Sequence, residues 1–140
     1  MKRSDRFREQ HEEMVKVVGQ ISALSTNADK VKQNANNVRA LLSQLMGSLK
    51  SHLAMEDNVL YPDLLKNSDE KVRNLATRYS SEMGGMKAAV EKYNSKWITA
   101  KNIEDNAAIF LSETKDLFNV LGKRIDRENS ELYPLLDKVA

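Results

Sequence analysis

Apolar residues recur at steps of three and four along most of this chain and form stripes separated by short polar links. One stripe runs through Ala35, Val38, Leu42, Leu45 and Leu49 and ends at His52 and Glu56. Steps of this size place the side chains on one face of a helix. A helix with such a face must pack against other helices to bury it, so repeated stripes constrain the chain to a helical bundle.

Three further stripes have the same spacing. They comprise Phe7, His11, Met14, Val18 and Ile21; then Val72, Leu75, Tyr79, Met83, Met86, Val90, Tyr93 and Trp97; and finally Ala107, Phe110, Thr114, Leu117, Leu121, Arg124 and Glu128. The chain has only five glycines and two prolines, and no strand-like alternation persists, so the fold class is all-α. Four inward stripes with short links predict an antiparallel up-down-up-down four-helix bundle, one domain over residues 1–140.

Polar residues and prolines set the expected helix ends. The first helix starts near Ser4 or Asp5 and fades at residues 25–27, and the second starts between residues 28 and 34. Pro62 predicts a kink or a short extra turn over residues 62–66. The third helix follows a turn at residues 67–69 and is interrupted at residues 84–85, and the fourth starts between residues 102 and 106.

The two halves of the chain repeat at an offset of 72 residues. Glu56 corresponds to Glu128, and Leu-Tyr-Pro at residues 60–62 recurs at residues 132–134. The bundle is therefore expected to consist of two pseudo-repeated helical hairpins. His11 and His52 have no histidine counterparts in the second half, where the matching positions are Met83 and Arg124.

Histidine and glutamate side chains on an inward stripe cost free energy unless other groups satisfy them. His52 and Glu56, four residues apart, point the same way on one helix, and His11 lies on the first stripe. The chain has no cysteine, so a metal ion would be held by His, Asp, Glu or Tyr. The residues leave two alternatives open: a metal site, or core histidines that hydrogen-bond to Glu56 and Glu128.

The segment H-L-A-M-E-D-N-V-L-Y-P at residues 52–62, with His11 before it and a second E-x-x-x-L-Y-P at residues 128–134, resembles the hemerythrin-like (HHE cation-binding) family. The resemblance implies a four-helix bundle that holds non-haem iron. His11, His52, Glu56 and Glu128 match the ligands of one iron. The histidines of a second iron are absent, so the resemblance implies one iron ion, with manganese or zinc as alternatives, and not a diiron centre.

Four further residues are expected near the position of the missing second metal. The hypothesis is that Arg124 fills this position and neutralises the carboxylates, because buried carboxylates without a cation cost several kcal/mol. The glycines at residues 84–85, beside Met83, would make room for it. Glu82 is expected to reach the site or to pair with Arg124, and Tyr79 to lie in the second shell or in the core. Tyr61 and Tyr133 are expected to have structural roles at the end of the bundle.

Composition excludes some functions. Charged residues are 30% of the chain with a net charge of +2 and interspersed signs, and no basic patch indicates nucleic-acid binding. No apolar run has membrane-spanning length and no signal peptide is evident, which favours a cytoplasmic protein.

Two functions are compatible with these residues. The first is a metal-binding protein that senses or handles iron, dioxygen, nitric oxide or redox state, with a small diatomic ligand as a second partner. The second is a metal-free, degenerate bundle that acts as a protein-interaction module. An enzyme is disfavoured, because the sequence shows no separate acid–base pair and no substrate cleft.

Overall fold

The computed structural model describes residues 2–138, without the side chain of Met83. Within these residues the chain is helical and contains no strand, which confirms the all-α fold class. The elements are α1 (Asp5–Leu24), α2 (Ala28–Gln33), α3 (Ala35–Met55), the π-helix η1 (Glu56–Leu60), α4 (Tyr61–Leu65), α5 (Glu70–Met83), α6 (Met86–Lys96), α7 (Ala100–Asp105), α8 (Ala107–Arg127), the π-helix η2 (Glu128–Leu132) and α9 (Tyr133–Lys138).

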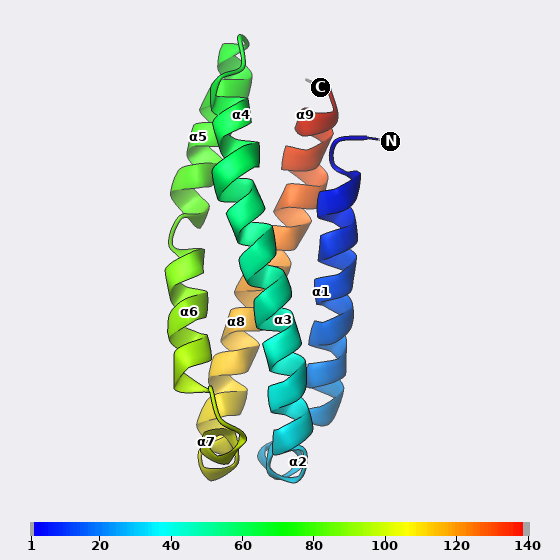
Figure 1. The fold of residues 1–140 in the computed structure, drawn as a ribbon, viewed down its shortest axis with the longest axis vertical. Coiled ribbons are helices and arrows are strands. Elements are labelled where there is room, and N and C mark those ends of the chain that lie inside the picture. Colours follow the sequence, from blue (N-terminus) through cyan, green and yellow to red (C-terminus); the bar gives the residue numbers. More distant parts are fainter. Residues whose placement is uncertain (1, 139–140) are drawn as a thin grey trace.

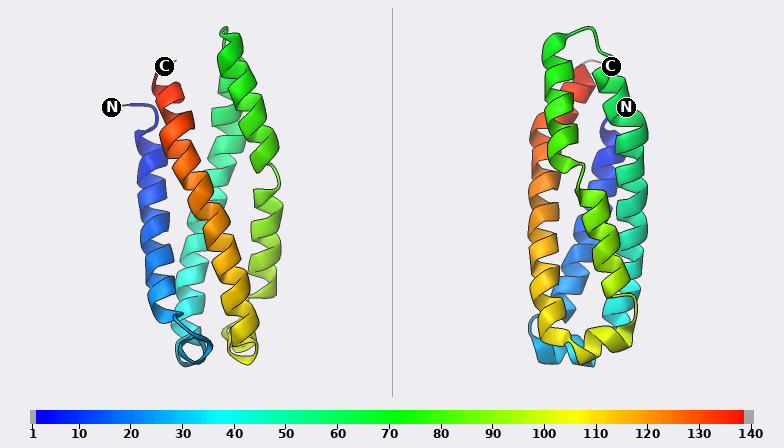
Figure 2. Two further views of the ribbon diagram at one scale, coloured as in Figure 1. Left: turned by 180° about the vertical axis from the view of Figure 1, so that it is seen from behind. Right: turned by 90° about the vertical axis from the view of Figure 1, so that its left-hand side faces the viewer.

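The longer helices run along one long axis, and the short helices α2 and α7 lie across it (Figures 1 and 2). Helix α1 packs against α3 and α8, α3 packs against α6, and α4 packs against α5. The short helices α2 and α7 lie together at one end of the molecule (Figure 1), while the two chain ends and the link between α4 and α5 lie at the other.

Two of the expected links contain helices of their own. Asn27 caps α2 by accepting a hydrogen bond from the backbone of Lys30, and Thr99 caps α7 by accepting one from Asn102. Asn27 and Thr99 are 72 residues apart, so both caps obey the repeat found in the sequence. The long helices α3 and α8 consequently begin slightly later than predicted, at Ala35 and Ala107.

A π-helix begins at each of the two inward glutamates. The backbone N–H of Tyr61 donates to the carbonyl of Glu56, and that of Tyr133 donates to the carbonyl of Glu128. A hydrogen bond between residues five apart defines the π-helix and marks one extra residue in the turn. The sequence predicted a break at Pro62, but the change of helix type begins six residues earlier, at Glu56.

A buried polar cluster, which comprises His11, His52, Glu56, Arg124 and Glu128, lies between two apolar clusters. The larger cluster holds Leu45, Leu49, Trp97 and Phe110 among others, and the smaller one, nearer the chain ends, includes Leu60. Along α1 the predicted stripe shifts by one position at one point: Val17 is fully buried, whereas Val18 is half-buried. Apolar packing on both sides therefore fixes the helices that carry the polar cluster.

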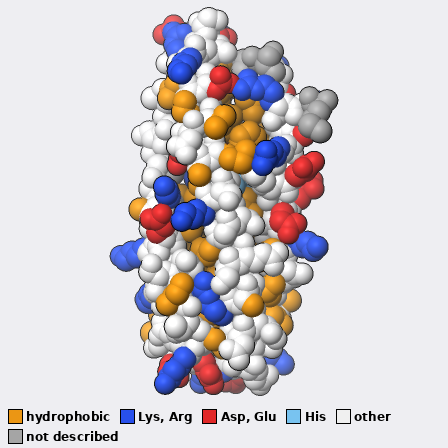
Figure 3. All heavy atoms as spheres, in the orientation of Figure 1, with side chains coloured by type: hydrophobic (Ala, Val, Ile, Leu, Met, Phe, Trp, Pro, Cys, Tyr) orange, Lys and Arg blue, Asp and Glu red, His pale blue; other side chains and the backbone are white. Residues whose placement is uncertain are grey.

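Charges of both signs are interspersed on the face seen in Figure 3. Among residues 2–138, no helix is long and apolar enough to span a bilayer.

Candidate metal centre

Two imidazole rings meet at the centre of the buried cluster. His11, from α1, and His52, from α3, are 2% and 1% exposed. Their Nε2 atoms lie 3.0 Å apart, and their ring centroids are 4.6 Å apart. Helices α1 and α3 pack directly on one another, so the two histidines reach the same level although 41 residues separate them.

The outer nitrogen of each ring is held by a side-chain amide oxygen. His11 Nδ1 lies 2.9 Å from Asn129 Oδ1, and His52 Nδ1 lies 2.6 Å from Gln10 Oε1. An amide oxygen only accepts hydrogen bonds, so each Nδ1 carries the proton. In the neutral rings both Nε2 atoms therefore present lone pairs to one another, and a proton or another cation between them would stabilise this arrangement.

Two glutamates complete the inner polar cluster, and both are fully buried. Glu128 Oε1 lies 2.9 Å from His11 Nε2 and 3.6 Å from His52 Nε2. Glu56 Oε1 lies 3.2 Å from His52 Nε2. One ligand atom each from His11, His52 and Glu128 forms a group within 4.8 Å, a group that does not include Glu56.

Arg124, on α8, pairs with both glutamates. Its Nη2 donates to Glu56 Oε1 at 2.9 Å and its Nε donates to Glu128 Oε2 at 3.4 Å. The Nη1 atom contacts Met86 Sδ at 3.3 Å. The side chain is 6% exposed, so this cation acts on the carboxylates in surroundings with little screening by water.

The hydroxyl of Tyr133 lies inside the cluster, although the sequence indicated only a structural role at the end of the bundle. It lies 3.1 Å from His11 Nε2, 3.4 Å from His52 Nε2 and 3.4 Å from Glu128 Oε1. It also donates to Glu56 Oε2 at 3.2 Å. In an α-helix, a residue five positions after Glu128 would leave its face, but the π-helix η2 brings Tyr133 back to it.

The charges in the cluster depend on one another. Burial opposes the charged form of His52, but hydrogen bonds with Glu128 and Glu56 outweigh it and raise its pKa to about 9. Burial and a hydrogen bond with Glu128 raise the pKa of Glu56 to about 7. Near neutral pH the metal-free cluster therefore holds a protonated His52.

Glu128 is the carboxylate that stays ionised. Burial opposes its charge, yet its contacts with Glu56, with both histidines and with Arg124 hold the pKa of Glu128 well below its usual range. When no metal is bound, the protonated His52 and Arg124 are thus the cationic neighbours of an anionic Glu128.

Some predicted site residues lie elsewhere. Tyr79 is buried, but its hydroxyl donates to Glu131 and not to the ligand atoms. Glu82 is exposed and pairs with Arg78 and Arg127 instead of with Arg124. Met83 ends α5, and its side chain lies outside the described residues.

Gln10 and Asn129, which hold the two histidines, were not identified from the sequence. Each adjoins a stripe residue, Gln10 before His11 and Asn129 after Glu128. Their position next to a predicted ligand was the only signal in the sequence for these two residues, because neither lies on an apolar stripe.

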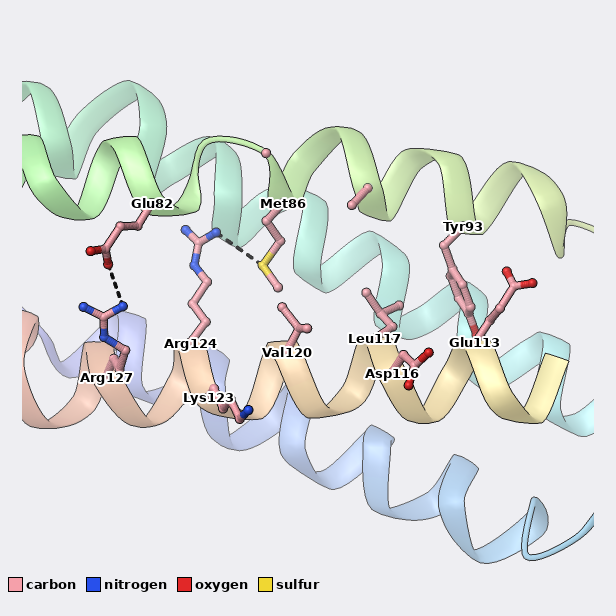
Figure 4. A pocket seen from close by; sticks show the side chains of 12 residues that line it. Glu82, Met86, Tyr93, Glu113, Asp116, Leu117, Val120, Lys123, Arg124 and Arg127 are labelled. Atoms are coloured by element: carbon pink, nitrogen blue, oxygen red, sulfur yellow. Dashed lines mark hydrogen bonds and ion pairs between the residues drawn. The ribbon is translucent and has the colours of Figure 1, made fainter. Parts of the chain in front are cut away.

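Two cavities approach the cluster from different sides. One of about 600 Å³ lies mainly between α6 and α8, and Met86 and Arg124 are in its lining (Figure 4). In Figure 4, Arg124 extends from α8 towards Met86, and the Glu82–Arg127 pair lies to one side. A second cavity, of about 390 Å³, has His11 and Asn129 in its lining. The sequence had shown no such cleft.

The fold and this cluster define a helical protein with buried imidazole and carboxylate groups that form a candidate cation site. The family model described as "Hemerythrin HHE cation binding domain" matches residues 3–136. The chain therefore belongs to the hemerythrin HHE cation-binding family. Neither the curated proteins nor the solved structures include a match to the chain.

Proposed function

We propose that this protein binds one metal ion between His11, His52 and Glu128. The observation that supports this most directly is the pair of Nε2 atoms 3.0 Å apart, with each Nδ1 held by an amide oxygen. Hydrogen bonds of this kind at the outer ring nitrogen are typical of metal-ligating histidines, because they fix the ring and its tautomer. Three ligand atoms at separations of 2.9–3.6 Å suit an ion about 2 Å from each.

The donor types favour non-haem iron. Two histidines and one carboxylate form the ligand set typical of non-haem Fe(II) sites, while manganese and zinc accept the same donors. Glu56, which the sequence predicted as a fourth ligand, adjoins the group and is paired with Arg124. Arg124 is proposed to stand where a second ion would be bound, so we propose one ion and not a diiron centre.

The proposed activity is the sensing or handling of iron, dioxygen, nitric oxide or redox state. Bound iron would supply a redox-active Lewis acid that binds small diatomic molecules. The cavity lined by His11 and Asn129 supports this proposal, because it brings small molecules close to one imidazole. Asn129 would orient the ring of His11, and Arg124 would hold the negative charge of Glu128 in place.

The finer features of the fold belong to the same proposal. We interpret α1, α3 with α4, α5 with α6, and α8 with α9 as the four members of an up-down-up-down bundle. On this interpretation α2 and α7 are short links within the two repeated hairpins, and the whole chain is one domain.

Metal analysis tests this function. Protein produced in iron-rich medium and handled without air should contain close to one equivalent of metal, and His52→Ala should lose it. Ser51→Ala, the exposed neighbour, is the matched control and should retain it. A chelator should lower the melting temperature of the wild type, because an ion at 100 times its dissociation constant stabilises the fold by about 2.7 kcal/mol.

One observation favours a second candidate function, a metal-free interaction module. Arg124 and a protonated His52 already balance the carboxylates, so the cluster is satisfied without a metal. For this candidate, purified protein contains no metal after growth in iron, and the chelator leaves the melting temperature unchanged.

A further inference from the structure

Four donor atoms in the cluster surround a single point. They are His11 Nε2, His52 Nε2, Glu128 Oε1 and the hydroxyl oxygen of Tyr133, and the six distances among them all lie between 2.9 and 3.6 Å. A tetrahedron with edges of this length has its centre about 2 Å from each corner. That distance is the usual one between a metal ion and nitrogen or oxygen ligands.

Glu56, the fourth ligand expected from the sequence, is engaged differently. Its Oε1 accepts a hydrogen bond from Arg124 Nη2 at 2.9 Å, and its Oε2 accepts one from Tyr133 at 3.2 Å. It is not part of the compact group that His11, His52 and Glu128 form. To become the fourth ligand of an ion in that group, Glu56 would have to move away from the buried guanidinium of Arg124. The hydroxyl of Tyr133 already lies at the fourth corner.

The ring of Tyr133 is held firmly at this corner. Its centroid lies 5.6 Å from that of Phe7 and 5.1 Å from that of His11, and the guanidinium of Arg8 lies 5.4 Å from it. The side chain is fully buried. The π-helix η2 supplies the extra residue that turns Tyr133 towards the cluster, so backbone and packing fix the position together.

We propose that Tyr133, and not Glu56, is the fourth protein ligand of the ion, an inference that rests on the metal-binding function proposed above. On binding, the phenolic O–H bond of Tyr133 breaks, its proton passes to water, and the oxygen keeps the electron pair that it shares with the ion. No oxidant or reductant is consumed. Glu56 loses this one donor and remains paired with Arg124.

The metal-free and metal-bound states differ in the protonation of Tyr133. Without metal, the hydroxyl of Tyr133 carries its proton and donates it in a hydrogen bond to Glu56 Oε2. With metal, the residue is a phenolate. The change is visible in the ultraviolet spectrum, because tyrosine and tyrosinate absorb differently.

Titration with Zn(II), which has no visible or redox signal of its own, tests the proposal. The wild type should show the difference spectrum of one ionised tyrosine as Zn(II) binds. Tyr133→Phe should lose this signal and release one proton fewer, and its affinity should fall at least about tenfold. Tyr79→Phe is the matched control, since that hydroxyl bonds to Glu131, and it should behave like the wild type.

The two glutamates provide the second arm of the test. Glu56→Gln should keep an affinity within a few-fold of wild type, whereas Glu128→Gln should lose most of it. With Fe(III), the wild type should also show a visible phenolate-to-iron charge-transfer band that Tyr133→Phe lacks.

Two results would overturn the proposal in different ways. Zn(II) binding that requires both histidines but produces no tyrosinate signal, with Tyr133→Phe equal to wild type, removes Tyr133 from the ligand set and leaves the metal function intact. Failure of the wild type to bind either Zn(II) or iron removes the proposed function itself. The tyrosinate signal is measured on the wild type, so the test survives a variant that does not fold.

Discussion

Arg124 Nη2 donates to Glu56 Oε1 across 2.9 Å, and this buried ion pair joins α8 to the π-helix η1. The same guanidinium also reaches Glu128, so one cation serves the equivalent glutamates of both halves of the chain. Substituting either partner removes a counter-charge from a buried charge, so the free energy of unfolding should fall.

Arg124→Met should destabilise the metal-free protein by about 3–5 kcal/mol, the usual cost of leaving a buried charge unpaired. Denaturant unfolding without metal measures this loss. Lys123→Met, at the exposed neighbouring position, is the control and should change the free energy of unfolding by no more than about 0.5 kcal/mol. Equal stability of the two variants would show that the ion pair contributes nothing to folding.

The two amides that hold the histidine rings should matter for metal binding although neither touches the ion. Gln10→Leu and Asn129→Leu should each weaken metal affinity about 10–100-fold, because the freed imidazole loses its fixed tautomer and orientation. Competition with a chromophoric chelator gives the affinities. Glu9→Gln, an exposed change on the same helix, should leave the affinity unaltered, and a similar loss in that control would contradict the explanation.

Much of the fold follows from apolar periodicity. The stripes identified helices at the positions of α1, α3, α5 with α6, and α8, and the repeat of 72 residues relates the caps Asn27 and Thr99 as well as the two glutamates. The short helices α2 and α7 were not predicted, because six residues are too few to show a period.

The π-helices account for the main site residue that sequence analysis missed. A period of 3.6 residues places Tyr133 off the face of Glu128, and no residue pattern indicated that the turn gains an extra residue. Glu82 adjoins Met83, the position that corresponds to His11 in the repeat, and was therefore expected near the site. Exposed partners Arg78 and Arg127 draw its carboxylate outwards instead.

The two adjacent glycines between α5 and α6 should respond differently to alanine. A Cβ at Gly85 meets no other atom within 4 Å, whereas one at Gly84 would lie 3.1 Å from the carbonyl oxygen of Ser80. Both residues have negative φ, which alanine adopts without strain. Gly85→Ala should therefore stabilise the protein by about 0.4–1 kcal/mol through the unfolded state.

Gly84→Ala should show no such gain, because the close contact with Ser80 offsets it. Thermal unfolding of the two variants side by side measures the difference. A larger stabilisation from Gly84→Ala than from Gly85→Ala would mean that the backbone at this junction relaxes freely.

The pH dependence of stability should be visible at the contact between the two ends of the helical chain. Asp137 on α9 accepts hydrogen bonds from the backbone N–H of Ser4 at 3.0 Å and from its hydroxyl at 2.7 Å. Burial opposes the charge, but these bonds from Ser4 prevail and lower the pKa of Asp137 below its ordinary value of 3.8. The carboxylate also lies at the N-terminus of α1, where a negative charge is favourable.

A lowered pKa in the folded state means that the folded protein binds the proton less readily than the unfolded chain. The stabilisation from Asp137 is therefore fully present above pH 3.8 and is lost as the pH falls through the lowered folded value. Asp137→Asn should cost about 1 kcal/mol at neutral pH, and the gap between variant and wild type should close in acid. Asp126→Asn on the exposed face of α8 is the control and should show no gap at either pH. Urea unfolding at neutral and acidic pH measures both gaps, and a gap for Asp137→Asn that persists unchanged in acid would contradict the role of its charge.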